Sequence, residues 1–335
     1  MLKEFTRYIE DNRLVNKNDR VLLAVSGGID SMVMTHLFIR AGIKTGIAHC
    51  NFCLRGDDSD RDEELVRKFA SGYNIDFFTK KFDTRAFAEE KGISIQMAAR
   101  DLRYAWFEKI RKINGFDSVA TAHNLNDNIE TFLINLTRGT GITGLSGIRK
   151  TRDRVIRPLL FATRKSIENY CIENRIEYRE DKSNAETKYL RNKIRHLVLP
   201  LLSEINPSIE SSLNETSERL NDINAIFTSY TSGLRKKLLK KRALIQAIEI
   251  EKLNPYLDNN TLLYELFRPF GIRSQSLNDL RNIVTGQSGS EIITPAHRII
   301  KNRRELIISE ITIKDDVCLH YGNSDELHEC PFIKS

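Results

Sequence analysis

The sequence predicts an α/β protein in which a parallel β-sheet carries helices on both faces. Short apolar runs alternate with segments of helical spacing up to about residue 200, and this alternation is typical of βαβ units. The first apolar run ends in two glycines that lead directly into a helical segment. After residue 206 the pattern changes to one long polar helix and then to short helices and strands. We therefore expect a Rossmann-like sheet domain, a connecting helix and a small α+β domain.

The periodicity of apolar residues places the individual elements. A short polar helix lies within residues 1–18. Apolar runs bounded by charge or glycine predict strands, and apolar residues three and four apart predict helices. The expected strands cover residues 21–25, 43–49, 75–82 and 118–123, and the helices cover 31–40, 58–70, 94–113, 125–137 and 163–174. A long helix is expected over 208–242, and short helices are expected at 262–267 and 277–284.

The Asn206-Pro207 pair breaks the chain and marks the end of the sheet domain. We expect residues 1–205 to form this domain and residues 206–242 to form a helical connector that ends in a basic run. Residues 243–335 are expected to form the small C-terminal domain.

The composition indicates a globular protein of the cytoplasm. Of the 335 residues, 40% are hydrophobic and 29% are charged, and no apolar run approaches the ~20 residues of a membrane span. The N-terminus carries acids and no apolar signal core, so neither secretion nor membrane association is expected. Five cysteines, an odd number, favour a reducing compartment. A net charge of +7 is compatible with a polyanionic partner, although many basic proteins bind no nucleic acid.

The turn after the first strand has the features of a phosphate-binding site. It joins the carboxyl end of a strand to the amino end of a helix, where backbone N–H groups are unpaired and the helix dipole favours an anion. Gly27 and Gly28 let the backbone close on a phosphate, and Asp30 supplies a carboxylate for a phosphate-bound Mg²⁺. No lysine follows the glycines, so the turn is not a Walker-type loop. The alternative is an ordinary Gly-Gly connection. The turn reads Ser26-Gly27-Gly28-Ile29-Asp30-Ser31.

A second polar cluster follows the strand expected at 118–123. His123 ends this strand, and Asp127 follows it by four residues in the first turn of the next helix. A histidine beside phosphate charge can donate a hydrogen bond, and an aspartate can orient it or hold a metal. The alternative is a histidine that serves as a helix cap or core residue. Because ligands of parallel sheets lie outside the carboxyl ends of the strands, Ser26, His49 and His123 are expected to share one crevice.

Two pairs of arginines each lie one helical turn apart. These are Arg100 with Arg103, beside Tyr104, and Arg191 with Arg195, which Asn192 accompanies. Such pairs suit the binding of phosphates or of an RNA backbone, and a solvated basic face is the alternative. The basic run over 235–242 is equally well explained as a solvated face or as a nucleic-acid contact.

Cys50 and Cys53 form a C-x-x-C pair, which raises a redox or metal interpretation. Two cysteines alone cannot complete a tetrahedral site, and the other three lie far away in sequence, at Cys171, Cys318 and Cys330. We assign no chemistry to the pair, and its role is left open.

Short sequence blocks follow one another along the first 200 residues. They begin at Ser26, His49 (His-x-Asn-x-x-Leu-Arg-Gly), Ser59 (Ser-Asp-x-Asp), Ala99 (Ala-Arg-x-x-Arg-Tyr), Ala120, Arg138 (Arg-Gly-Thr-Gly), Arg157 (Arg-Pro-Leu), Glu180 and Tyr189 (Tyr-x-Arg-Asn-x-x-Arg). Taken in this order, the blocks resemble the PP-loop ATP pyrophosphatase family, and within it the tRNA(Ile)-lysidine synthetase family. The first block is shared by many PP-loop enzymes, whereas the Arg-Gly-Thr-Gly and Arg-Asn-x-x-Arg blocks are more specific. The resemblance is dense over residues 20–200 and loose over 240–310.

The resemblance implies a two-step ligation on RNA. ATP adenylates the C2 oxygen of the wobble cytidine in the CAU anticodon of a minor tRNA(Ile), and the amine of free L-lysine then displaces AMP to give lysidine. This changes the codon read from AUG to AUA and the amino acid charged from methionine to isoleucine. A nucleobase must be splayed out of its loop to enter such a crevice.

The resemblance also implies site residues. The turn would bind the departing pyrophosphate with Mg²⁺ on Asp30, and His123 and Asp127 would stabilise charge at the α-phosphate. The implied catalytic residues are Asp30, His123 and Asp127; the ATP-binding residues are Ser26, Gly27, Gly28, Ile29, Asp30, Ser31, Arg100 and Arg103; the residues for tRNA or intermediate are Arg138, Arg191, Asn192 and Arg195.

Two departures from the family pattern and several open points remain. Phe52-Cys53 stands where the family often has a second histidine, so position 52 receives no catalytic role. Many members carry a further C-terminal domain, whereas this chain ends soon after the small module. We expect either that the contacts which that domain makes with tRNA are missing or that the chain is a short form. The alternatives are a PP-loop tRNA thiolation enzyme, an amidotransferase-type ligase and a non-catalytic RNA-binding protein. The lysine-binding acids, the way tRNA(Met) is rejected and the oligomeric state, monomer or homodimer, are left open.

Overall fold

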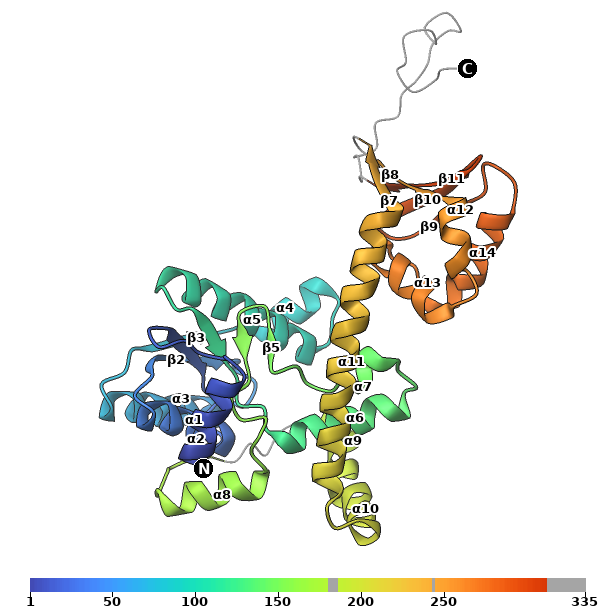
Figure 1. Ribbon diagram of the computed structural model, residues 1–335. Helices are drawn as coiled ribbons and strands as arrows, with labels where there is room; N and C mark the ends of the chain where they lie inside the picture. The colour runs from blue at the N-terminus through green and yellow to red at the C-terminus, as the bar shows by residue number, and fades with distance from the viewer. Residues whose placement is uncertain (180–185, 243–244, 312–335) are drawn as a thin grey trace, which may run out of the picture. The chain divides into compact units, whose positions relative to one another are not determined.

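The computed structural model describes residues 1–179, 186–242 and 245–311 (Figure 1). The chain divides into two compact units, Met1–Asn224 and Ala225–Ser335, which we describe separately. The block that begins at Glu180 lies outside the described residues, as do Cys318, Cys330 and the side chain of Tyr189.

The first unit is built on a six-stranded sheet with the order β3-β2-β1-β4-β6-β5. Every neighbouring pair is parallel except β5 with β6. The chain runs outward from β1 to β3 and then returns to the other side of β1 with β4, so the strand order reverses between β1 and β4. Ligands bind at such a switch point in open α/β sheets. The strands are β1 (Arg20–Ala24), β2 (Lys44–Asn51), β3 (Phe77–Lys81), β4 (Ser118–Ala120), β5 (Thr151–Arg152) and β6 (Val155–Ile156).

Helices cover both faces of this sheet (Figure 1), which confirms the expected α/β class. Neighbouring residues of β1 point to opposite faces: Leu23 belongs to a core with α1, α2 and α8, and Leu22 belongs to a core with α5. The helices are α1 (Leu2–Asp11), α2 (Ile29–Arg40), α3 (Asp57–Gly72), α4 (Thr84–Lys91), α5 (Ile95–Ile113), α6 (Leu125–Thr137), α7 (Ile142–Leu145), α8 (Arg164–Glu173), α9 (Glu186–Lys193) and α10 (Leu199–Ile205), with a π-helical turn at Ile194–Val198.

The long helix α11 (Ile209–Leu238) begins in the first unit. Its polar side chains there hydrogen-bond the glycine-rich segment after α6: the Ser217 hydroxyl donates to the Ser146 carbonyl (3.2 Å), and the Asn221 amide donates to the same carbonyl (2.5 Å). Ser217 and Asn224 are buried. The polarity that the sequence shows over this stretch therefore reflects, in the first unit, hydrogen bonding as well as contact with water.

Gly147 closes the glycine-rich segment against α6. Its φ is +63°, and a Cβ there would lie 2.2 Å from the Asn128 Oδ1 and 2.7 Å from the Ser217 Oγ. Gly139 has a similar φ of +66° with open space around it. The two positions therefore share the backbone conformation that favours glycine and differ in the room for a side chain.

Gly147→Ala is expected to lower the free energy of unfolding by about 2–4 kcal/mol, because steric overlap adds to backbone strain. Gly139→Ala is the matched control and should lose only the strain, about 1 kcal/mol. The measurement is urea unfolding followed by the fluorescence of Trp106, the single tryptophan, which is buried in the first unit. Equal losses in the two variants would show that the close approach to Asn128 carries no energy.

The second unit is an antiparallel sheet with the order β7-β8-β11-β10-β9, packed against short helices. Its core also includes Leu234 and Leu238, from the end of α11. The elements are β7 (Leu239–Arg242), β8 (Ile245–Glu249), α12 (Ile250–Leu253), α13 (Asn260–Phe267), α14 (Leu277–Thr285), β9 (Glu291–Ile293), β10 (His297–Asn302) and β11 (Glu305–Glu310), with 3₁₀ turns at Asn254–Tyr256, Arg268–Phe270 and Ser274–Ser276.

The expectation of a helix up to residue 242 was wrong at its end. α11 stops at Leu238, and Leu239–Arg242 forms β7, because these residues pair with β8 in the sheet. Two cations of the basic run are held by carboxylates of the same unit: Lys240 pairs with Glu249, and Arg242 pairs with Glu305 at 2.7 Å. This reduces the charge that the run presents to a nucleic acid. In the described part of the chain, no helix combines the length and apolar character that crossing a bilayer requires.

Candidate active site

The turn between β1 and α2 leads into the amino end of a helix. No side chain of the described residues caps α2, whose N-cap is Gly28, so within this part of the chain its first backbone N–H groups are available to an anion. Gly27 adopts a φ of +91°, which explains the need for glycine. The Ser31 hydroxyl donates to the Gly28 carbonyl (2.9 Å), and the Ser26 N–H donates to the Ser31 Oγ (3.2 Å). These contacts hold the turn in a shape that suits a phosphate.

Asp30, in the first turn of α2, faces the end of β4. The Asn124 side-chain amide donates to its Oδ1 (2.9 Å), and the Arg164 guanidinium lies 3.9 Å from its Oδ2. Burial raises the pKa of Asp30, and the negative charge of Asp127 raises it further, whereas Asn124 and Arg164 lower it. Asp30 and Asp127 therefore lie near one another at the switch point of the sheet.

Asp127 and Asn124 form a reciprocal cap at the start of α6. The Asn124 N–H donates to the Asp127 carboxylate and the Asp127 N–H donates to the Asn124 side-chain oxygen, each at 3.0 Å. Asn124 thus connects the cap of α6 to Asp30 through its amide group. The helix begins at Leu125, as the sequence predicts.

His123 lies directly before this cap, and its Nδ1 is 3.0 Å from the Thr121 Oγ1. Burial lowers the pKa of His123 to about 4, Asp127 opposes the shift, and Arg157, Arg191 and Arg100 lower the pKa further. The imidazole is therefore neutral near pH 7, within reach of three guanidinium charges and one carboxylate. His123 and Asp127 therefore lie beside Asp30 at the carboxyl ends of β1 and β4, whereas the sequence predicts Ser26, His49 and His123 together there.

The predicted arginines divide into different environments. Arg195 forms an ion pair with the fully buried Glu130, with distances of 2.6 and 2.8 Å from Nη2 and Nε to Oε1. Arg100 stacks on Tyr104, with its Cζ 4.9 Å from the ring centroid. Arg103 stacks on Phe52, with its Cζ 5.2 Å from the ring centroid.

The other predicted residues lie at helix ends. The positive charge of Arg191 lowers the pKa of His123. Asn192 and Arg138 are exposed at the ends of α9 and α6.

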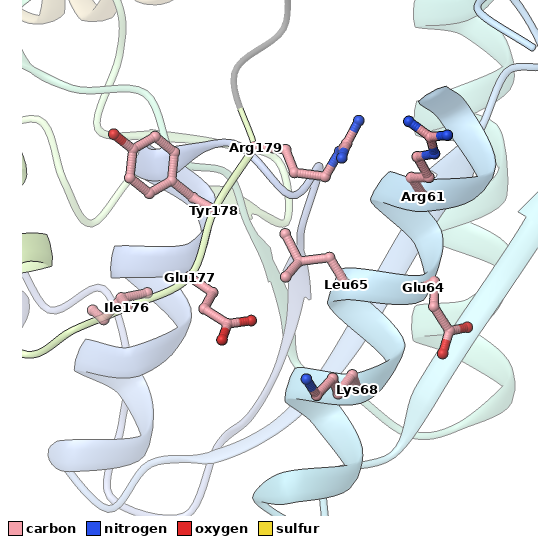
Figure 2. A pocket seen from close by; sticks show the side chains of 8 residues that line it. All are labelled: Arg61, Glu64, Leu65, Lys68, Ile176, Glu177, Tyr178 and Arg179. Atoms are coloured by element: carbon pink, nitrogen blue, oxygen red, sulfur yellow. The ribbon is translucent and has the colours of Figure 1, made fainter. Parts of the chain in front are cut away.

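The segment 176–179 lies against the phosphate turn. The Arg179 N–H donates to the Gly27 carbonyl (3.0 Å), and its guanidinium pairs with Asp62 (2.7 Å) and Asp58 (2.8 Å) of α3. The other Asp62 oxygen accepts from Arg55 (2.7 Å). Figure 2 shows the groove of about 570 Å³ between this segment and α3, with the Tyr178 ring pointing away from the helix.

Asp62→Asn is expected to lower the free energy of unfolding by about 1–3 kcal/mol, because one buried carboxylate holds two guanidinium groups. The change should also speed hydrogen exchange at the Arg179 amide. Asp58→Asn is the control, since this carboxylate is exposed and its ion pair contributes at most ~1 kcal/mol. Unfolding followed by Trp106 fluorescence gives both values, and an equal loss in the two variants would contradict the assignment of the anchor to Asp62.

The two cysteines of the C-x-x-C pair lie in different environments. Burial raises the pKa of the Cys50 thiol to about 12, so it is not a thiolate near pH 7. Cys53 is exposed with a φ of +52°. Among the residues that the structure describes, no three His, Cys, Asp or Glu side chains come together as metal ligands. His49 is buried in β2, where its Nδ1 lies 2.9 Å from the carbonyl of Val25, the residue after β1.

Comparison with known proteins decides the family. A family model described as the PP-loop domain matches residues 1–202, and one described as the TilS substrate binding domain matches residues 242–311. The tRNA(Ile)-lysidine synthase of Bacteroides thetaiotaomicron is 40% identical over 315 residues, which cover 94% of this chain and 73% of that protein. The chain belongs to the tRNA(Ile)-lysidine synthase family.

Other similarities agree with this membership. The tRNA(Ile)-lysidine synthase of Porphyromonas gingivalis is 38% identical over 316 residues, which cover 94% of this chain and 69% of that protein. Among solved structures, the U34-tRNA thiolase NcsA of Methanococcus maripaludis has a TM-score of 0.55 and 19% identity, covering 65% of this chain and 78% of that one. At this identity the likeness concerns the fold alone. The resemblance that the sequence motifs indicate, to the lysidine synthetase branch of the PP-loop family, is confirmed.

Several residues of this lysidine synthase site were not assigned from the sequence. Asn124 has a recognisable signal, because an asparagine three residues before an acid at a helix start is typical of a reciprocal cap. Arg164 and Arg179 had no local signal, since their partners lie more than 100 residues away in the chain. Arg157 stood in a matching block, but its position beside His123 depends on how β6 joins the sheet.

Proposed function

We propose that this chain ligates L-lysine to C2 of the wobble cytidine in a tRNA(Ile) with a CAU anticodon. As a lysidine synthase family member with a PP-loop domain, it is an ATP-using ligase that modifies tRNA. The reaction consumes ATP, passes through an adenylated cytidine, and yields AMP and pyrophosphate in the cytoplasm. The single observation that carries the proposal is that the phosphate turn, Asp30 and the neutral His123 come together at the carboxyl ends of β1 and β4.

The turn at Ser26–Ser31 supports binding of the pyrophosphate part of ATP. Uncapped N–H groups of α2 match the phosphate oxygens, and Ser26 adds a hydroxyl donor. Mg²⁺ commonly takes one or two carboxylates and fills its other positions with phosphate oxygens and water. Asp30 fits this pattern, with Asp127 nearby as a second negative charge. A bound Mg²⁺ would neutralise charge on the phosphates.

His123 suits the α-phosphate side of the reaction. When the Thr121 hydroxyl donates to Nδ1, the neutral ring carries its proton on Nε2 and can donate it as a hydrogen bond to a phosphoryl oxygen. Asp127 supports this position through the cap that fixes the turn after His123. Arg100 and Arg191 add positive charge around the ring, where negative charge develops as pyrophosphate departs.

The test is a reconstituted reaction with ATP, Mg²⁺, labelled lysine and a tRNA(Ile) transcript with a CAU anticodon. The proposal expects label in the RNA and one AMP for each lysine incorporated. A tRNA(Met) transcript with the same anticodon letters is the matched control and should remain unlabelled. Pyrophosphate release that depends on tRNA but gives no lysine incorporation would contradict the proposed nucleophile and direct attention to sulfur.

A further inference from the structure

Arg157 is a buried cation of the sheet domain. The residue is only 7% exposed, and one terminal nitrogen donates to the Arg149 carbonyl at 2.7 Å. Within residues 1–179, 186–242 and 245–311, its Nε has no hydrogen-bond partner and no acid forms an ion pair with it. Burial of a charged group is costly unless the charge is compensated. One carbonyl and the Tyr104 phenol compensate a guanidinium only in part.

The fold places this cation at the crevice. β6 lies parallel to β4 with Ile156 opposite Ala120, and the Thr121 N–H donates to the Ile156 carbonyl at 3.0 Å. Arg157 therefore follows the carboxyl end of β6 just as Thr121 follows the carboxyl end of β4. His123, which contacts Thr121, lies in the same row of strand ends.

The surroundings of Arg157 are positive. Burial is the main cause that lowers the pKa of Arg157. The charges of nearby Arg100 and Arg152 lower it further, whereas the Tyr104 phenol raises it. Arg100 itself stacks on Tyr104. Like charges gathered around a buried guanidinium favour an anionic partner from outside the chain. Phosphate is the anion that matches a planar guanidinium and a neighbouring imidazole.

We propose that Arg157 binds a phosphate group beside His123, supplied by the α-phosphate of ATP or by the backbone of the tRNA. This inference rests on the proposed function and adds Arg157 to the residues that contact its substrates. The geometry favours the α-phosphate, because Arg157 and the phosphate turn both lie at the carboxyl edge of the sheet.

The test compares Arg157→Gln with Arg154→Gln in the full chain. Arg154 is an exposed arginine of the same hairpin, so its replacement removes the same charge outside the crevice. ATP affinity is measured by calorimetry without tRNA, and tRNA affinity by filter binding at several salt concentrations without ATP. Loss of one charge-assisted contact is expected to raise the dissociation constant of the ligand on the order of tenfold to a hundredfold.

The two phosphate sources give different results. Weaker ATP binding in Arg157→Gln with unchanged tRNA binding identifies the α-phosphate. Weaker tRNA binding with unchanged ATP binding, together with a salt slope shallower by about one, identifies a backbone phosphate. Wild-type affinity for both ligands in the folded variant would overturn the proposal and leave Arg157 as an anchor of the 149–157 hairpin.

Arg157→Lys keeps the test decisive if Arg157→Gln does not fold. Lysine keeps the charge but lacks the planar fork, so the same ligand should bind about tenfold more weakly. Unchanged affinity of this variant for both ligands would also overturn the proposal. Because both binding measurements omit lysine, they remain interpretable even if the wild-type chain fails to incorporate lysine into tRNA.

Discussion

Replacement of Asp30 by asparagine is expected to reduce lysine incorporation at least a hundredfold while leaving tRNA affinity within about twofold. The carboxylate lies at the amino end of α2, is held by Asn124, and is our candidate ligand for phosphate-bound Mg²⁺. An amide keeps the hydrogen-bonding shape but loses the charge, and loss of one electrostatic partner in a catalytic site costs about 10²–10³ in rate. The measurement is the initial rate of lysine incorporation, with filter binding of tRNA in parallel.

The pH dependence of the wild-type rate provides a second test of Asp30. Burial and the charge of Asp127 raise the pKa of Asp30 above the usual value of an aspartate, so the charged form is lost at a higher pH than for an ordinary aspartate. The rate should therefore decline on the acid side as Asp30 is protonated. Asp101→Asn, on the exposed surface of α5, is the matched control and should keep the wild-type rate and profile. A fully active Asp30→Asn variant would contradict the role proposed for the Asp30 carboxylate.

Replacement of Arg195 by methionine is expected to lower the free energy of unfolding by about 3–5 kcal/mol near neutral pH. Glu130 is fully buried, and its Oε1 forms the ion pair with Arg195. The other carboxylate oxygen of Glu130, Oε2, has no hydrogen-bond partner among the described residues. Removal of one partner of a buried pair leaves an uncompensated charge, which costs about this amount. Urea unfolding followed by Trp106 fluorescence measures the loss.

The loss should depend on pH in a defined direction. Burial raises the pKa of Glu130, and without Arg195 the pKa rises further, so the folded state binds a proton more tightly than the unfolded state. The free energy of unfolding of the variant then falls as the pH rises from the pKa of Glu130 in the unfolded state to its pKa in the folded state. Arg195→Met should accordingly be more destabilised at pH 8 than at pH 5, and the added change Glu130→Gln should restore part of the loss. A loss that is independent of pH would show that Arg195 acts through packing alone.

Local chemistry was sufficient to predict the frame of the site. The apolar run before the glycines became β1, and the helix expected at 125–137 has those bounds because Asn124 caps it. Alternation of strands and helices gave the parallel sheet, which in turn placed Asp30 and His123 at one edge. These features depend on residues close together in the chain, and periodicity and capping describe such features well.

Features that depend on distant partners were not predictable from the sequence. The pair of Arg195 with Glu130 spans 65 residues, and the contact of Arg179 with Asp62 spans 117. The short strand β6, which positions Arg157, has only two residues and no periodicity to detect. After α11 the helical pattern of the sequence does not continue as a helix, because the backbone groups of Leu239–Arg242 hydrogen-bond to β8 in the sheet.

The most direct test of the proposed mechanism follows the α-phosphate of ATP rather than the incorporation of lysine. The chain is mixed with ATP labelled at the α-phosphate, Mg²⁺ and a tRNA(Ile) transcript with a CAU anticodon, and lysine is omitted. The mechanism predicts that label becomes attached to the wobble cytidine and is released as AMP when lysine is added. A parallel reaction contains lysine and omits tRNA. Label that attaches to lysine in that reaction would contradict the mechanism, because the enzyme would then activate the amino acid and not the RNA.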